Sequence, residues 1–228
     1  MPLLLIVAII AYPFDRERKF MFILVRMWTK LLLTAAGAKV ELSGADKLPD
    51  PPAVVVSNHI SHMDVPAIVS KIKSPFTFLT KQSLYRIPVF GLALRVLGMV
   101  PVDRDDPNKR RLALSDAQNL IKKGCKSYIF FFPEGARSLD GNLLPFKNGA
   151  FVMAKRTKLP LVVIKVSGSD KVLPPRTLDL KKGDIKVEVV ETLYSDVFFH
   201  LSVEELSAKV KSLLETESGE QISGCTGA

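Results

Sequence analysis

The chain has 228 residues, enough for one large domain or two small ones. With 47% hydrophobic and 24% charged residues, the composition excludes a disordered chain and fits a globular or membrane-associated protein. The net charge of +9 favours an anionic partner, and nucleic acid, a membrane surface and phosphorylated metabolites all have that sign. Two distant cysteines, Cys125 and Cys225, argue against a disulfide framework or zinc site and fit a reducing compartment.

The N-terminal segment is unusually apolar. "MPLLLIVAIIAYPF" has no charged side chain, yet as a helix it would span only about 21 Å, short of a hydrocarbon core of roughly 30 Å. It lacks a basic leader and a clear cleavage site, so it is a poor secretory signal. This segment alone predicts neither a confident membrane crossing nor a cleaved leader.

A second apolar segment follows the charged break "DRERK". On a helical projection its basic side chains lie within roughly 40° of one another, and an apolar group lies opposite. The basic group is Lys19, Arg26 and Lys30, and the apolar group is Leu24, Trp28 and Leu31. We expect residues 1–37 to form a helical pair seated in a membrane. An ordinary pair of core helices is the alternative.

Beyond residue 37, strand-like and helix-like segments alternate. Apolar or β-branched runs predict strands at Ala53–Val56, Phe76–Thr80, Met99–Val102, Tyr128–Phe132, Leu161–Val166 and Ile185–Val190. Helical spacing predicts helices at Val65–Lys71, Ser83–Leu97, Pro107–Lys123 and Asn148–Lys158. This order indicates an α/β fold with a largely parallel central sheet flanked by helices, over residues 38–214. Residues 215–228 are polar and small, which predicts a flexible tail.

Active sites of such sheets gather beyond the carboxyl ends of the strands. Four loops in this position carry polar residues: Asn58, His59 and Asp64; then Asp103, Arg104, Asp105 and Asp106; then Glu134 and Arg137; and last Ser167, Gly168 and Ser169. The chain contains no G-x-G-x-x-G, Walker loop or G-x-S-x-G motif, which disfavours nucleotide binding and the common esterase layout.

These loops supply the parts of a general-base site that binds a phosphate. A neutral imidazole, here His59, can take a proton from a hydroxyl near pH 7. A carboxylate such as Asp64 can hold the ring in one tautomer and stabilise the imidazolium. Two arginines on separate loops can bind a phosphate. An isolated H-x-x-x-x-D is more often only a polar loop, and His62 is interpreted as a structural residue at a helix N-terminus.

Four motifs, "NHISHMD", "VPVDR", "FPEGARS" and "LPLVVI", occur in this order. Together they resemble the lysophosphatidic acid acyltransferase family (1-acyl-glycerol-3-phosphate acyltransferases), a resemblance that runs from about Val40 to Leu193. The first and third motifs are specific, whereas the second and fourth are weak alone. Ala136 departs from the family's frequent threonine, but Glu134 and Arg137 are in place.

The resemblance implies roles for individual residues. His59 matches the catalytic histidine and Asp64 its partner. The implied substrate-binding residues are Lys81, Arg104, Glu134, Gly135 and Arg137, with Lys81 and Arg104 near the acceptor's phosphate. Pro160 matches the proline of the fourth motif, which is tied to donor binding and packing.

The reaction implied is acyl transfer from acyl-CoA or an acyl-carrier protein to the sn-2 hydroxyl of 1-acyl-glycerol-3-phosphate, which makes phosphatidic acid. The resemblance implies no metal, no cofactor and no nucleic-acid partner. It implies a membrane-associated protein with its catalytic domain on the cytoplasmic or stromal-type side. Three alternatives stay open: an acyltransferase for glycerol-3-phosphate or another lysophospholipid, a non-enzymatic basic protein that binds membrane or nucleic acid, and a thioesterase.

Overall fold

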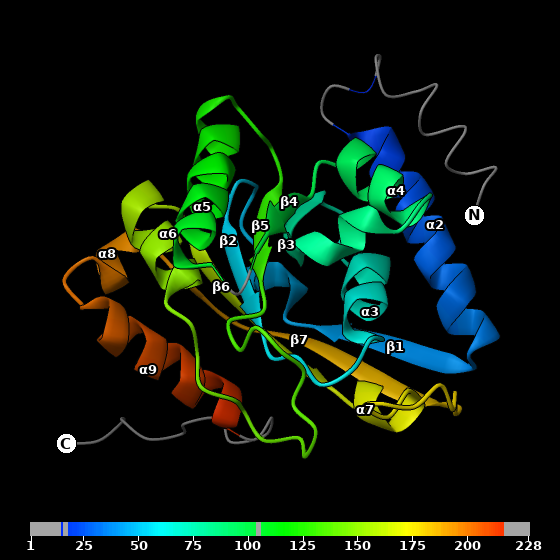
Figure 1. Ribbon diagram of the computed structural model, residues 1–228. Helices are drawn as coiled ribbons and strands as arrows, with labels where there is room; N and C mark the ends of the chain where they lie inside the picture. Colours follow the sequence, from blue (N-terminus) through cyan, green and yellow to red (C-terminus); the bar gives the residue numbers. More distant parts are fainter. Residues whose placement is uncertain (1–14, 16–17, 104–105, 217–228) are drawn as a thin grey trace, which may run out of the picture.

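A seven-stranded sheet forms the centre of the computed structural model, which describes residues 15, 18–103 and 106–216 (Figure 1). Its strands are β1 (Ala38–Ser43), β2 (Val54–Ser57), β3 (Phe76–Lys81), β4 (Val100–Val102), β5 (Tyr128–Phe131), β6 (Leu161–Ser167) and β7 (Gly183–Leu193). Their spatial order is β1-β7-β6-β2-β5-β3-β4, and all neighbours run parallel except β6 and β7. The predicted α/β class and largely parallel sheet are confirmed.

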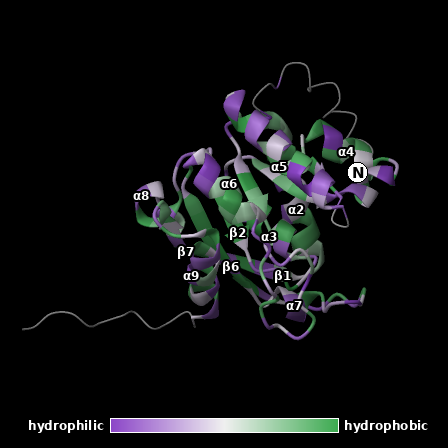
Figure 2. Cartoon of the chain, turned by 60° about the vertical axis from the view of Figure 1, so that its left-hand side comes forward, coloured by the Kyte–Doolittle hydropathy of each residue, from purple (hydrophilic) through white to green (hydrophobic). Residues whose placement is uncertain are grey.

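Helices cover both faces of this sheet (Figure 1). They are α2 (Lys19–Ala35), α3 (Asp64–Lys71), α4 (Phe90–Val96), α5 (Pro107–Lys122), α6 (Gly149–Thr157), α7 (Ser169–Val172), α8 (Ser195–Phe198) and α9 (Val203–Glu215), with 3-10 turns η1 (Ala45–Lys47) and η2 (Gln82–Arg86). Because β2 is covered on both sides, its valines are all buried: Val55 joins the core cluster beside α2 and α3, whereas Val54 and Val56 join the cluster beneath α5, α6 and α9. Figure 2 shows the apolar interior between these layers.

The predicted helix Ser83–Leu97 is wrong as one element. It is divided into η2 and α4, because Pro88 lacks the N–H that a continuous helix needs and Val89 has φ 64°. Five elements of the described structure were not predicted: β1, η1, α7, α8 and α9. β1 is an edge strand whose residues are alternately exposed and partly buried, and α9 begins at a capping box between Ser202 and Glu205.

The second apolar segment of the N-terminal region forms α2, whereas residues 1–14 lie outside the described residues. α2 packs against α3 and buries Phe22 and Leu33 in the core cluster shared with the sheet. The basic group expected on its surface is divided, since the Arg26 guanidinium donates to the Lys73 carbonyl beside α3. Within the described ranges, no helix combines the length and apolar character needed to cross a membrane.

Candidate active site

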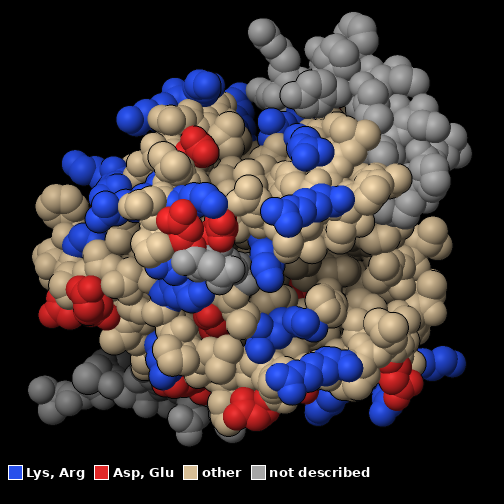
Figure 3. Space-filling model, in the orientation of Figure 1, with Lys and Arg blue, Asp and Glu red and all other residues tan. Residues whose placement is uncertain are grey.

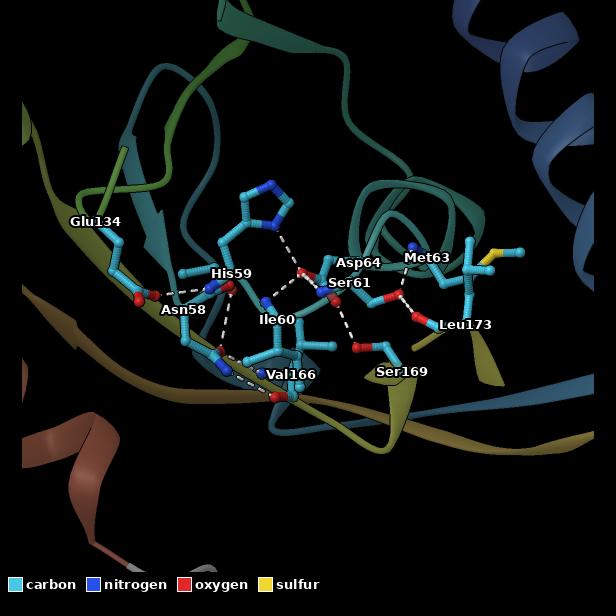
Figure 4. Close-up of polar contacts among 11 residues, drawn as sticks. Asn58, His59, Ile60, Ser61, Met63, Asp64, Glu134, Val166, Ser169 and Leu173 are labelled. Atoms are coloured by element: carbon cyan, nitrogen blue, oxygen red, sulfur yellow. Dashed lines mark hydrogen bonds and ion pairs between the residues drawn. The ribbon is translucent and has the colours of Figure 1, made fainter. Parts of the chain in front are cut away.

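The loop that follows β2 brings His59 and Asp64 together, as the motif predicts (Figure 4). The His59 Nδ1 atom lies 2.7 Å from Asp64 Oδ2, and Asp64 is the first residue of α3. The Asp64 side chain is completely buried, while 18% of the imidazole is exposed. A carboxylate can only accept, so Nδ1 donates and the other ring nitrogen, Nε2, is left as a proton acceptor.

The Asp64 carboxylate has a full set of donors. Its Oδ2 atom also accepts from the backbone N–H groups of Ile60 (2.9 Å) and Ser61 (3.0 Å). Its Oδ1 atom accepts from the Ser169 hydroxyl at 2.5 Å. These bonds compensate for the burial of the carboxylate and fix the direction in which it holds the imidazole.

The backbone of His59 is held from the loop after β5. Glu134 Oε1 accepts from the His59 N–H at 2.8 Å, and Oε2 accepts from the Leu144 N–H at 2.9 Å. The Ser138 N–H donates in turn to the His59 carbonyl at 2.8 Å. The imidazole stacks on the Phe132 ring, with 4.0 Å between centroids and 19° between planes. His59 is therefore fixed by both its backbone and its ring.

Burial raises the pKa of Glu134, and the hydrogen bonds from the Leu144 and His59 N–H groups oppose that shift. The side chain is only 4% exposed, and both of its oxygens accept backbone bonds. The contacts of Glu134 thus hold the loop that carries His59.

The comparison with protein families matches residues 39–167 to the family described as Acyltransferase. This range includes His59, Asp64 and the "FPEGARS" loop. The chain belongs to the acyltransferase family.

Relatives of this chain include a chloroplastic 1-acyl-sn-glycerol-3-phosphate acyltransferase of Brassica napus, 37% identical over 84% of the present chain. The chain spans a little over half of that relative, 57% of its length. A 1-acyl-sn-glycerol-3-phosphate acyltransferase of Salmonella typhimurium is 32% identical, over 74% of the present chain and 67% of its own. The solved 1-acyl-sn-glycerophosphate acyltransferase of Thermotoga maritima has 25% identity and a TM-score of 0.75, covering 91% of the present chain and 84% of its own.

The structure describes four of the five predicted binding residues. Gly135 has φ 70°, and a Cβ there would lie 2.6 Å from the Lys147 ammonium, so the turn favours glycine. Arg137 is partly exposed, and Lys81 is exposed at the end of β3. Arg104 lies outside the described residues. Figure 3 shows Lys and Arg side chains gathered around the middle of one face, which suits anionic substrates.

Two other residues of the sequence motifs, His62 and Pro160, have defined positions in the structure. His62 lies two residues before α3, and its side chain reaches solvent. Partial burial is the largest cause that lowers the pKa of His62, and the positive charges of Arg137 and His59 lower this pKa further. Pro160 precedes β6, and its carbonyl accepts from the Val54 N–H at 2.9 Å. These contacts leave its role in donor binding a prediction.

Sequence reasoning assigned no role to Asn58, Phe132 or Ser169. The Asn58 side chain donates to the Val166 carbonyl and accepts from the Val166 N–H, each at 2.8 Å. The amide thus pairs with β6 in the way that the backbone of a neighbouring strand would. The only feature of the sequence that could have pointed to Asn58 is its position next to His59. From the sequence, Ser169 could be identified only as a polar residue after the predicted strand Leu161–Val166. Its contact with Asp64 could not be predicted, because the two residues are 105 positions apart.

Proposed function

We propose that this acyltransferase moves an acyl chain from a thioester, acyl-CoA or an acyl-carrier protein, to the sn-2 hydroxyl of 1-acyl-glycerol-3-phosphate, forming phosphatidic acid. One observation carries the proposal: a buried Asp64 holds His59 through Nδ1 and leaves Nε2 of a partly exposed ring able to accept a proton. The names of the Brassica napus, Salmonella typhimurium and Thermotoga maritima proteins support the choice of acceptor.

In this mechanism the acceptor's hydroxyl donates its proton to His59 Nε2 as its oxygen attacks the thioester carbonyl carbon. The new C–O bond forms a tetrahedral intermediate, and the C–S bond breaks as that intermediate collapses. His59 returns the proton to the departing thiolate. Asp64 stabilises the imidazolium between these steps. The sequence of bonds requires no acyl-enzyme intermediate.

The acceptor's phosphate would bind among the cationic residues and loops around the dyad. Arg137 is the best candidate among the described residues, since its charge acts on His62 beside His59. Lys81 and Arg104 remain proposed members of this group, and Gly135 would let backbone approach the ligand. Glu134 was predicted to bind substrate, but both of its carboxylate oxygens accept from backbone N–H groups. In this proposal it therefore supports the site by holding the backbone of His59.

Membrane seating is also part of the proposal. Four apolar side chains of α2, Phe20, Ile23, Met27 and Leu31, are exposed and share one helical face. At its N-terminal end α2 is joined to α4 by the bond from Arg18 to the Leu97 carbonyl, and α4 exposes Phe90 and Leu92. An apolar surface of this kind suits the interface of a bilayer, where an acceptor with an acyl chain, such as 1-acyl-glycerol-3-phosphate, would reside.

The test is thiol release by the purified full-length chain in detergent, with a panel of acceptors and both donor types. Fast release that requires 1-acyl-glycerol-3-phosphate, with phosphatidic acid as product, is the expected result. Preference for glycerol-3-phosphate or for a lysophospholipid with a head group would identify a different acyltransferase. Free fatty acid released without any acceptor would identify a thioesterase, and no turnover of any thioester would contradict enzymatic activity.

A further inference from the structure

Ser169 completes the hydrogen bonding of the catalytic aspartate from a distant part of the chain. It is the first residue of α7 and is completely buried. Its hydroxyl lies 2.5 Å from Asp64 Oδ1, the oxygen that does not face His59 (Figure 4). Since a carboxylate oxygen can only accept, the serine hydroxyl donates.

The path of the chain places this hydroxyl accurately. β6 lies beside β2, so its end reaches the same sheet edge as the His59 loop. Gly168, with φ 80°, then turns the chain; a Cβ there would lie 2.3 Å from the Asp184 carbonyl oxygen, so a larger residue would disturb the turn. The turn directs Ser169 inward toward Asp64.

Three further hydrogen bonds tie this segment to the catalytic loop. Asn58 pairs with Val166 before the turn, and the Ser61 hydroxyl donates to the Leu173 carbonyl after it, at 2.8 Å. Ser169 therefore lies between two fixed points. Its bond to Asp64 belongs to a preorganised site.

We propose that Ser169 is a positioning residue of the acyl-transfer reaction, acting through Asp64 on His59; this inference rests on the proposed function. By donating to Oδ1, Ser169 fixes the plane of the carboxylate so that Oδ2 stays directed at His59 Nδ1. Asp64 then stabilises the imidazolium that forms on His59. Without the hydroxyl, a buried carboxylate oxygen loses its donor in a place that water does not reach.

The first test compares Ser169→Ala with Ser169→Thr and with the control Ser70→Ala. Ser70 is a buried serine of α3 whose hydroxyl donates to the Ala67 carbonyl at 2.7 Å, away from the dyad. Ser169→Ala should lower kcat on the order of 10- to 100-fold, the range for a hydrogen bond to a charged group. The KM values of both substrates should stay unchanged, because the buried hydroxyl touches neither. Ser169→Thr should recover most of kcat, while Ser70→Ala should lower stability without this loss.

A double-variant comparison separates positioning from ordinary structural support. In an Asp64→Asn background the partner through which Ser169 acts has changed, so adding Ser169→Ala should cause little further loss of kcat. The inference would be overturned if Ser169→Ala lowered kcat by the same factor in the Asp64→Asn protein as in the wild type. It would also be overturned if the Ser169→Ala single variant kept normal kcat. Should threonine prove too large for the site, the double-variant result still decides.

His59→Ala distinguishes failure of this inference from failure of the proposed function. If His59→Ala is inactive and folded while Ser169→Ala has normal kcat, only the role of Ser169 is refuted. If folded His59→Ala turns over normally, the general-base mechanism itself is refuted.

Discussion

At the scale of single residues, Glu134 shows how a buried charge can serve a neighbouring side chain. Its two oxygens accept from the N–H groups of His59 and Leu144, which lie on different loops. Burial raises its pKa, so the folded chain binds this proton more readily than the unfolded chain does. This difference makes the contribution of Glu134 to stability dependent on pH.

The sign of that dependence can be measured with Glu134→Gln. Between the ordinary glutamate pKa of about 4.5 and the raised pKa of Glu134, the folded state holds more protons than the unfolded state. The free energy of unfolding of the wild type should therefore fall as pH rises through this window, and Glu134→Gln should lack this component. Urea titrations of both proteins at several pH values measure the difference, with exposed Glu204→Gln as control. Parallel curves for wild type and Glu134→Gln would contradict the assignment.

At the scale of secondary-structure elements, the pattern of apolar runs predicts the strands that carry the site. The dyad could be predicted because His59 closely follows a buried strand and Asp64 begins the next helix, only five residues away. Ser169 could not be assigned a role, because its contact depends on β6 lying next to β2. The division between η2 and α4 was missed because the apolar spacing continues across Pro88. The helical backbone conformation, in contrast, is interrupted there.

One buried hydroxyl in β3 offers a test of the packing of the sheet. Thr77 is completely buried, and its Oγ1 atom has no hydrogen-bond partner among the described residues. Thr77→Val should raise the free energy of unfolding by about 1 kcal/mol, since it removes an unpaired polar atom at nearly constant volume. The control is Thr29→Val, which removes a hydroxyl that donates to the Arg26 carbonyl at 2.9 Å. Denaturant titration should show a gain for Thr77→Val only, and a loss there would count against the unpaired hydroxyl.

At the scale of the whole molecule, α2 combines two roles on two faces. Phe22 and Leu33 belong to the core cluster, whereas Met27 and Leu31 are 61% and 67% exposed. The boundary at residue 37 is thus not a break in packing, and α2 belongs to the body of the domain. Its outer face is the part available to a bilayer.

The double variant Met27→Glu, Leu31→Glu tests this face without removing core residues. Binding to anionic phospholipid vesicles should weaken by at least about 10-fold, because two apolar side chains are replaced by charges that anionic lipids repel. Leu112→Glu, at a 63% exposed position of α5, is the matched control and should bind as the wild type does. Co-sedimentation with vesicles measures both. Equal loss in the two variants would show that added negative charge, and not the α2 face, decides binding.

General-base catalysis by His59 is tested most directly by kcat of His59→Ala with 1-acyl-glycerol-3-phosphate and an acyl thioester. Alanine keeps the backbone N–H that donates to Glu134, so the loop should stay folded while the base is lost. If His59 is the general base, kcat should fall by about 10²- to 10⁴-fold, the usual contribution of general acid–base catalysis. Near-normal turnover by a folded His59→Ala protein would contradict it.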